Sequence, residues 1–194
     1  MSKQNIKEKI ITTAWELFYR KGFEETTLND IIEEAGIAKG TFYYYFRSKD
    51  TLLNTLSVIL DEKYRELERE LPEGMDEFDQ LIELNYRIHT FMGEHIDHSL
   101  LANQYASQLI AGEESNLLDK NRYYFTLVTR IVEEGQRNGA IINTRSVREI
   151  VAFYSLCERA LVTDWCMNKG EYSLGEVSRD YMPMMFSGMR GKHV

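Results

Sequence analysis

The stretch from Thr27 to Asp50, TLNDIIEEAGIAKGTFYYYFRSKD, constrains the fold of this chain more than any other part of its sequence. On both sides of Gly36 its apolar residues recur at the three- and four-residue steps of an α-helix. Thr27 and Asp30 have the spacing of a capping box, and glycine is a common C-terminal stop. The stretch therefore predicts two short helices joined by a tight turn at Gly36.

The second of these helices carries five consecutive aromatic residues, Phe42–Phe46. Phe42 and Phe46 are four positions apart and are expected to face the core. Five consecutive positions cannot all face one core, so the tyrosines between them are expected to lie laterally or outward. A face of tyrosine hydroxyls flanked by lysines suits a partner with many hydrogen-bond acceptors, and a DNA groove meets that description better than a small substrate does.

Helical periodicity continues through almost the whole chain, which contains only two prolines. We expect an all-α fold of about nine helices, with a three-helix helix-turn-helix domain over residues 1–47 and a larger helical effector-binding and dimerisation domain over 48–194. Ser48 is expected to be the N-cap of a rod of about 24 residues. The later helices are expected near 75–94, 98–111, 116–138, 146–168 and 174–189, with breaks at Gly112, Gly139 and Gly170.

The helix expected near 146–168 is apolar on two faces, and the one near 174–189 resembles it. A helix that is apolar nearly all round is buried on both sides. One side can pack on the chain's own core and the other needs a partner. This pattern predicts a homodimer formed through these two helices.

Charge is unevenly distributed along the chain. The formal net charge is −8, but residues 1–50 hold eight Lys or Arg and eight Asp or Glu and are neutral. This asymmetry leaves the N-terminal part as the plausible face toward phosphate. The apolar runs are far shorter than the roughly 20 residues of a membrane span, and the polar start is unlike a signal peptide. We therefore expect a cytoplasmic protein with no membrane partner.

Three segments of the first 53 residues resemble a known family: AWELFYRKGF near 14–23, TTLNDIIEEAGI at 26–37 and KGTFYYYFRSKDTLL at 39–53. They are similar to the TetR-type (TetR/AcrR) transcriptional regulators. The remainder matches only loosely, in helix count and in EEGQRNGAI at 133–141. The resemblance implies a homodimeric, ligand-responsive regulator, most often a repressor. Its N-terminal domains would bind a palindromic DNA operator, and a small molecule in the C-terminal domain would lower DNA affinity.

The resemblance also implies which residues face DNA. Carried over by position, they are Thr27, Lys39, Gly40, Thr41, Tyr43, Tyr44, Tyr45 and Lys49. Thr27, Tyr45 and Lys49 are expected to contact phosphates, and Lys39, Thr41 and Tyr43 to read base edges. Gly40 has no side chain, so backbone can approach a phosphate closely. Ala38 departs from the serine common in this family and removes one capping and phosphate-binding hydroxyl.

An effector pocket is expected among the helices after the rod, with an apolar or aromatic small molecule as ligand. The candidate lining residues are aromatic, polar or sulfur-containing: Tyr86, His89, Met92, Tyr105, Gln108, Tyr123, Phe125 and Trp165. Each of them can equally be an ordinary core residue. The sequence indicates no catalytic set, cofactor or metal site, which argues against an enzyme. A small helical enzyme and a helical interaction module whose N-terminal unit binds protein remain as alternatives.

Overall fold

The computed structural model describes residues 3–110 and 116–191, and within these it leaves out the side chains of 3, 4, 50, 54, 107–110 and 116. The described part is all-α, which confirms the predicted fold class, apart from one isolated bridge between Ile141 and Arg190. Its α-helices are α1 (Lys3–Lys21), α2 (Leu28–Ala35), α3 (Lys39–Tyr45), α4 (Leu56–Arg69), α5 (Glu77–His95), α6 (His98–Ile110), α7 (Tyr123–Asn138), α8 (Val147–Met167) and α9 (Leu174–Phe186). Short 3₁₀ helices η1 (Asp50–Thr55), η2 (Asn116–Leu118) and η3 (Ser187–Met189) complete it.

The chain divides into two compact units, one of Met1–Ile59 with Asn103–Leu117 and one of Leu60–Ala102 with Leu118–Val194. Helix α4 begins in the first unit and continues into the second. The domain boundary expected between residues 47 and 48 stays a prediction. None of the helices in the described ranges is long and apolar enough to cross a membrane.

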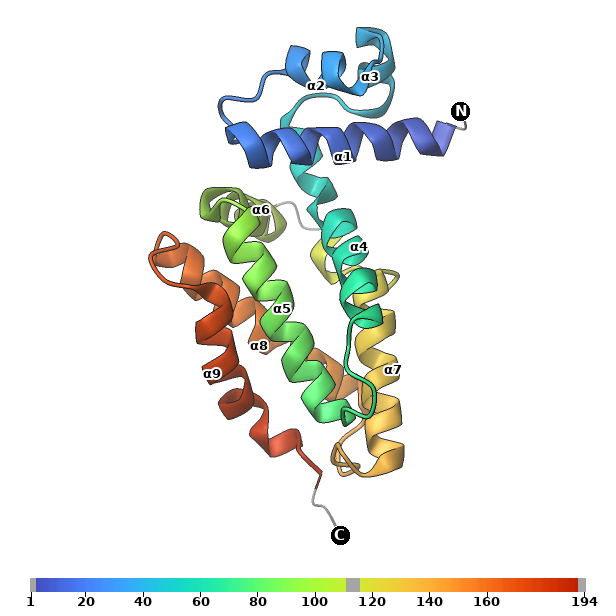
Figure 1. The fold of residues 1–194 in the computed structure, drawn as a ribbon, viewed down its shortest axis with the longest axis vertical. Helices are drawn as coiled ribbons and strands as arrows, with labels where there is room; N and C mark the ends of the chain where they lie inside the picture. Colours follow the sequence, from blue (N-terminus) through green and yellow to red (C-terminus); the bar gives the residue numbers. More distant parts are fainter. Residues whose placement is uncertain (1–2, 111–115, 192–194) are drawn as a thin grey trace. The chain divides into compact units, whose positions relative to one another are not determined.

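The first unit is built on α1, which packs against α2 (Figure 1). Ile10, Ala14 and Leu17 recur at helical steps and are fully buried. The indole Nε1 of Trp15 donates a 2.9 Å hydrogen bond to the hydroxyl of Thr55. That bond ties α1 to η1 at the point where the chain turns toward α4.

The turn between α2 and α3 forms as the sequence predicts. Thr27 and Asp30 make a complete capping box at the start of α2. Gly36 ends the helix in the left-handed region, with φ of 59°, which costs glycine no Cβ clash. The N–H of Ile37 then donates to the carbonyl of Ile32 at 3.1 Å and closes the turn.

The long rod expected from Ser48 is wrong in its first turns. The chain forms η1 first, and α4 proper covers only Leu56–Arg69. Lys49 precedes η1 without a side-chain cap, so the predicted N-cap role of Ser48 is also wrong. The hydroxyls of Thr51 and Thr55 donate to the carbonyls of Ser48 and Leu52, three residues earlier, at 2.7 and 2.6 Å. These bonds favour the tighter 3₁₀ winding.

The helix expected over 116–138 is also shorter than predicted. After η2 the chain turns at Asp119, whose carboxylate accepts a 2.9 Å bond from the N–H of Asn121. Side chains of this type compete with helical backbone bonding, and α7 therefore starts at Tyr123. The break predicted at Gly112 lies outside the described residues.

In the second unit α5 packs against α7 and α9, and α8 also packs against α7 and α9 (Figure 1). The ring of Phe186, fully buried, lies 5.6 Å from Phe78 on α5 and 5.5 Å from Tyr154 on α8, centroid to centroid. Aromatic packing of this kind joins the helices into one core.

Candidate functional site

Helix α3 has one anchored face and one open face. Phe42 is fully buried and Phe46 is 6% exposed, as their spacing predicts. Tyr43 and Tyr44 are 50% and 67% exposed, and together they place two adjacent aromatic rings on the surface of α3. The two phenylalanines fix the helix, and the tyrosines project from it.

The N-terminal end of α3 is accessible. Lys39 and Gly40 are exposed, and Thr41 is half-buried. A Cβ added to Gly40 would meet no atom within 4 Å, so the fold itself does not require glycine there. Ala38 precedes α3 and makes no side-chain capping bond, as expected. This end of the helix is open to an approaching partner.

Thr27 is exposed, but both of its donors already have a partner. Its N–H and its hydroxyl each donate to Oδ2 of Asp30 at 2.8 Å. The bond from the Thr27 backbone and the neighbouring Lys21 ammonium lower the pKa of Asp30 to about 2. A phosphate contact by Thr27 therefore stays a prediction, and it requires the hydroxyl to turn away from Asp30.

Lys49 lies folded against the loop before α2. Its ammonium donates to the carbonyl of Phe23 at 2.6 Å and lies 4.1 Å from the centroid of the Phe23 ring. The side chain holds the segment after α3 against the segment after α1. Its predicted contact with phosphate stays a prediction.

Tyr45 and Arg47 complete the surroundings of α3. The rings of Tyr44 and Tyr45 lie edge to face, with centroids 4.8 Å apart, and Tyr45 is half-buried. Arg47 is exposed directly after the anchor Phe46. Arg47 was missed from the sequence, although a cation two residues past the end of α3 was a usable signal for a phosphate contact.

Three of the residues expected to line an effector pocket have partners on α9 or just before it. His89 is buried, its Nδ1 lies 2.5 Å from the hydroxyl of Ser178 on α9, and burial lowers its pKa to about 3. Tyr86 also faces α9, where the guanidinium of Arg179 lies 3.7 Å from the ring centroid. Trp165 donates to the carbonyl of Tyr172 at 2.8 Å.

The other five members of that set belong to α5, α6 and α7. Met92 is buried on α5, and Tyr105 is half-buried on α6. Tyr123 and Phe125 stand at the start of α7. The side chain of Gln108 lies outside the described residues. The pocket assignment stays a prediction for all eight residues.

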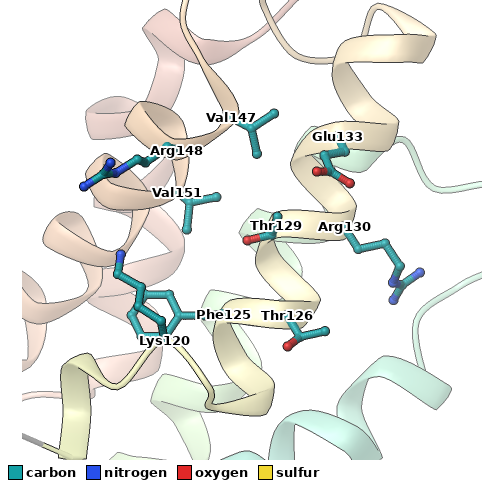
Figure 2. Close-up of a pocket in the computed structure, with 9 residues that line it drawn as sticks. All are labelled: Lys120, Phe125, Thr126, Thr129, Arg130, Glu133, Val147, Arg148 and Val151. Carbon is teal, nitrogen blue, oxygen red and sulfur yellow. The ribbon is translucent and has the colours of Figure 1, made fainter.

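A pocket of about 850 Å³ lies between α7 and α8 (Figure 2). We call it the α7–α8 groove, and it is lined by Lys120, Phe125, Thr126, Thr129, Arg130, Glu133, Val147, Arg148 and Val151. Of the expected effector residues only Phe125 is among them. The charged members were missed because an exposed charge in a helical sequence is usually a solvated face.

Glu158 on α8 supplies a buried carboxyl that contacts three other helices. Glu158 on α8 accepts bonds from the hydroxyl of Tyr64 at 3.1 Å, from the amide of Asn85 at 3.3 Å and from the hydroxyl of Tyr124. Burial raises the pKa of Glu158, and these three donors oppose the shift. The carboxyl thus joins α4, α5 and α7. In the part of the chain with described coordinates, no group of three His, Cys, Asp or Glu is placed to hold a metal ion.

The N-terminal unit matches a known family model. Residues 10–56 match the model described as bacterial regulatory proteins, tetR family. A regulator of the helix-turn-helix type from the lacX 3′ region of Lactococcus lactis is 52% identical over 46 residues, which are 24% of each chain. The chain thus spans about a quarter of that relative.

Two longer similarities cover almost the whole chain. The fatty acid metabolism regulator protein of Bacillus subtilis is 26% identical over 196 residues, 95% of each chain. The crystal structure of the regulator FadR from Bacillus subtilis in complex with stearoyl-CoA has a TM-score of 0.66 at 22% identity, over 94% of this chain and 99% of that one. The latter similarity establishes the shared fold of both units.

The motif residues, the two-faced α3 helix and these similarities agree with the resemblance found in the sequence. Residues 10–56 thus carry the N-terminal module of the tetR family of bacterial regulatory proteins.

Proposed function

We propose that this chain is a repressor that binds a palindromic DNA operator as a homodimer and leaves it when a small molecule binds the second unit. The observation that carries the proposal is the pair of faces on α3, with Phe42 buried and Tyr44 exposed. A helix held from behind, with hydroxyl and ammonium donors in front, suits insertion into a major groove.

We assign each α3 side chain a DNA contact from its position along the helix. Lys39, Thr41 and Tyr43 lie where the N-terminal part of a recognition helix meets base edges. The open space at Gly40 supports close approach of a phosphate. Tyr44, Tyr45 and Arg47 lie toward the other end of the helix and are assigned to the DNA backbone.

Dimerisation is supported by exposed apolar side chains on α8 and α9. Leu156 and Met167 are 54% and 76% exposed on α8, and Tyr181 and Met184 are 54% and 72% exposed on α9. A second copy of the chain would cover this face. Two copies related by a two-fold axis would present two α3 helices to the half-sites of a palindrome.

Release by an effector is supported by α4, one helix with residues in both units. A ligand that binds the second unit and favours one position of α4 shifts the population of DNA-competent dimers. The stearoyl-CoA named with the FadR structure makes acyl-CoA thioesters the first compounds to test. The match of residues 10–56 to bacterial regulatory proteins supports a non-enzymatic role in the cytoplasm.

A gel shift with the DNA upstream of the protein's own gene tests the proposal. We expect a specific complex whose affinity falls steeply with salt and is lost in Tyr43→Ala. Leu156→Glu should give a monomer by light scattering and lose the complex as well. Arg137→Gln, an exposed change on α7, is the control and should bind like the wild type.

Failure to bind any genomic fragment, with or without a metabolite extract, would refute the repressor. Turnover of a metabolite by the purified chain would favour the helical enzyme instead. Capture of a protein partner that depends on Tyr43 and Tyr44, without DNA binding, would favour the interaction module.

A further inference from the structure

The α7–α8 groove has the size and wall composition of a small-molecule site. Its volume of about 850 Å³ falls within the range of roughly 300–1,000 Å³ that ligand pockets occupy. Phe125 and Val151 are buried and Val147 is half-buried, so the floor is apolar. Figure 2 shows Val151 and Thr129 facing one another across the space between the two helices.

The charge of the groove is opposite to that of the chain. Three of its lining side chains are cations, Lys120, Arg130 and Arg148, and one is a carboxylate, Glu133. The whole chain has 31 acidic and 23 basic residues. A local excess of positive charge beside an apolar floor favours an anion that also carries an apolar part.

Lys120 and Arg148 are the cations best placed to receive such an anion. Both are exposed, and among the described residues neither forms an ion pair. The Lys120 ammonium lies 5.1 Å from the ring centroid of Phe125, at the edge of the apolar floor. Arg130 is different, because it already pairs with Glu68 on α4 and points away from Lys120 in Figure 2.

We propose that the α7–α8 groove binds an amphipathic anion, with its acid group on Lys120 and Arg148 and its apolar part against Phe125, Val147 and Val151. This proposal rests on the proposed function, because it assigns the effector of that regulator to a site and a chemical class. The ion pair would form without breaking an existing one, so little of its energy is lost to competition.

The groove is linked to α4 through Tyr124, which packs against both Phe125 and Tyr64. The ring of Phe125 lies 4.8 Å from that of Tyr124, and Tyr124 lies 5.1 Å from Tyr64 on α4, centroid to centroid. Tyr124 and Tyr64 both donate to Glu158. A ligand that shifts Phe125 therefore acts on the hydrogen bonds that hold α4 in the second unit.

Two fluorescent probes of similar shape and different charge test the site. 8-Anilinonaphthalene-1-sulfonate is an aromatic anion, and N-phenyl-1-naphthylamine is its neutral counterpart. The full-length chain is titrated with each probe in the absence of DNA. The variants are the double substitution Lys120→Gln with Arg148→Gln, the apolar-wall substitution Val147→Gln, and the control Arg137→Gln, which removes an exposed α7 cation outside the groove.

We expect the double variant to raise the Kd of the sulfonate about tenfold or more, because both cations that receive the acid group are lost together, and to leave the Kd of the neutral probe within about twofold. Val147→Gln should raise the Kd of both probes, and Arg137→Gln should leave both Kd values unchanged. Unchanged sulfonate binding in the double variant would overturn the proposal. An equal loss of both probes in that variant would also overturn it.

The same variants separate this proposal from the proposed function. The double variant should bind the operator like the wild type in a gel shift without ligand. If the double variant binds the operator but its Kd for the sulfonate is unchanged, the groove is not the anion site, and the proposed DNA-binding function is retained. If the double variant selectively loses sulfonate affinity but neither it nor the wild type binds DNA, the groove is a ligand site and the repressor function is refuted.

Discussion

Asp61 on α4 and Arg122 ahead of α7 form the most buried ion pair of the described residues, at 2.8 Å, with side chains 12% and 9% exposed. The Asp61 carboxylate also accepts from the backbone N–H groups of Tyr123 and Tyr124, at 3.2 and 3.3 Å. Arg122 is the N-cap of α7 and makes no capping bond of its own. A carboxylate from α4 thus caps α7 and neutralises its positive end.

Asp61→Asn should destabilise the second unit by about 3 kcal/mol or more, because it removes one charge of a buried, hydrogen-bonded ion pair. Urea unfolding followed by circular dichroism measures the change. Glu62→Gln, on the next residue, is the matched control. Glu62 pairs with Arg65 at 3.0 Å on the exposed side of the same helix, and its loss should cost less than about 1 kcal/mol. Equal losses in the two variants would show that burial of the Asp61 pair is unimportant.

Gly40→Ala should weaken operator binding and leave the fold intact. The added methyl meets nothing within 4 Å, and alanine favours a helix over glycine by about 0.5–1 kcal/mol. We therefore expect an unchanged or slightly higher melting temperature together with a raised Kd for DNA. Gly188→Ala, also in open space but in η3, is the control for DNA binding. A Gly40→Ala variant with wild-type affinity would remove Gly40 from the interface.

Phe42→Ala and Tyr44→Ala should separate folding from binding. Phe42 is fully buried, and truncation of a buried phenylalanine costs about 3–5 kcal/mol, so the first unit should unfold at a lower temperature. Tyr44 is 67% exposed, and its truncation should change stability by about 0.5 kcal/mol or less. In the gel shift Tyr44→Ala should still lose affinity. A large drop in the melting temperature of Tyr44→Ala would instead make Tyr44 a structural residue.

His89 should make the protein less stable in mild acid. Burial lowers its pKa to about 3 from 6.5, so the unfolded chain binds a proton below pH 6.5 while the folded chain stays neutral. The depressed pKa of a base means that stability falls as the pH drops from about 6.5 toward 3, by up to about 1.4 kcal/mol per pH unit.

Between pH 7 and pH 5 the wild type should therefore lose about 2 kcal/mol more than His89→Asn, which keeps a group near the Ser178 hydroxyl but does not titrate. Urea midpoints at the two pH values give the difference. The ring resonances of His89 in the folded protein provide a check that needs no variant. A ring that titrates near pH 6.5 would contradict the prediction.

Several features of the first unit could be predicted from local signals in its sequence. The capping box of Thr27 and Asp30, the end of α2 at Gly36 and the burial of Phe42 depend on residues within a few positions of each other, and each was predicted. The winding of η1 was not. It depends on threonine hydroxyls bonding to carbonyls three residues back, which competes closely with ordinary helix formation.

Contacts between segments that are distant in the chain could not be predicted from the sequence. Lys49 is 26 positions from Phe23, and nothing in the motif indicates that its ammonium binds that carbonyl. The α7–α8 groove draws Lys120 from a loop and Arg148 from α8, so its positive charge arises only on folding. Phe125 was named as an effector residue from its aromatic character alone. The cations beside it were not predicted, because a charged residue in a sequence does not reveal which residues surround it after folding.

The five aromatic residues of α3 also bear on how such a regulator can evolve. Phe42 and Phe46 keep the helix in place whatever stands between them, and Tyr43 and Tyr44 carry little of the packing. Mutational drift at the outward positions can change the DNA sequence that is recognised and leave the scaffold untouched. A duplicated gene can therefore acquire a new target through a few codon changes, without passing through a chain that fails to fold.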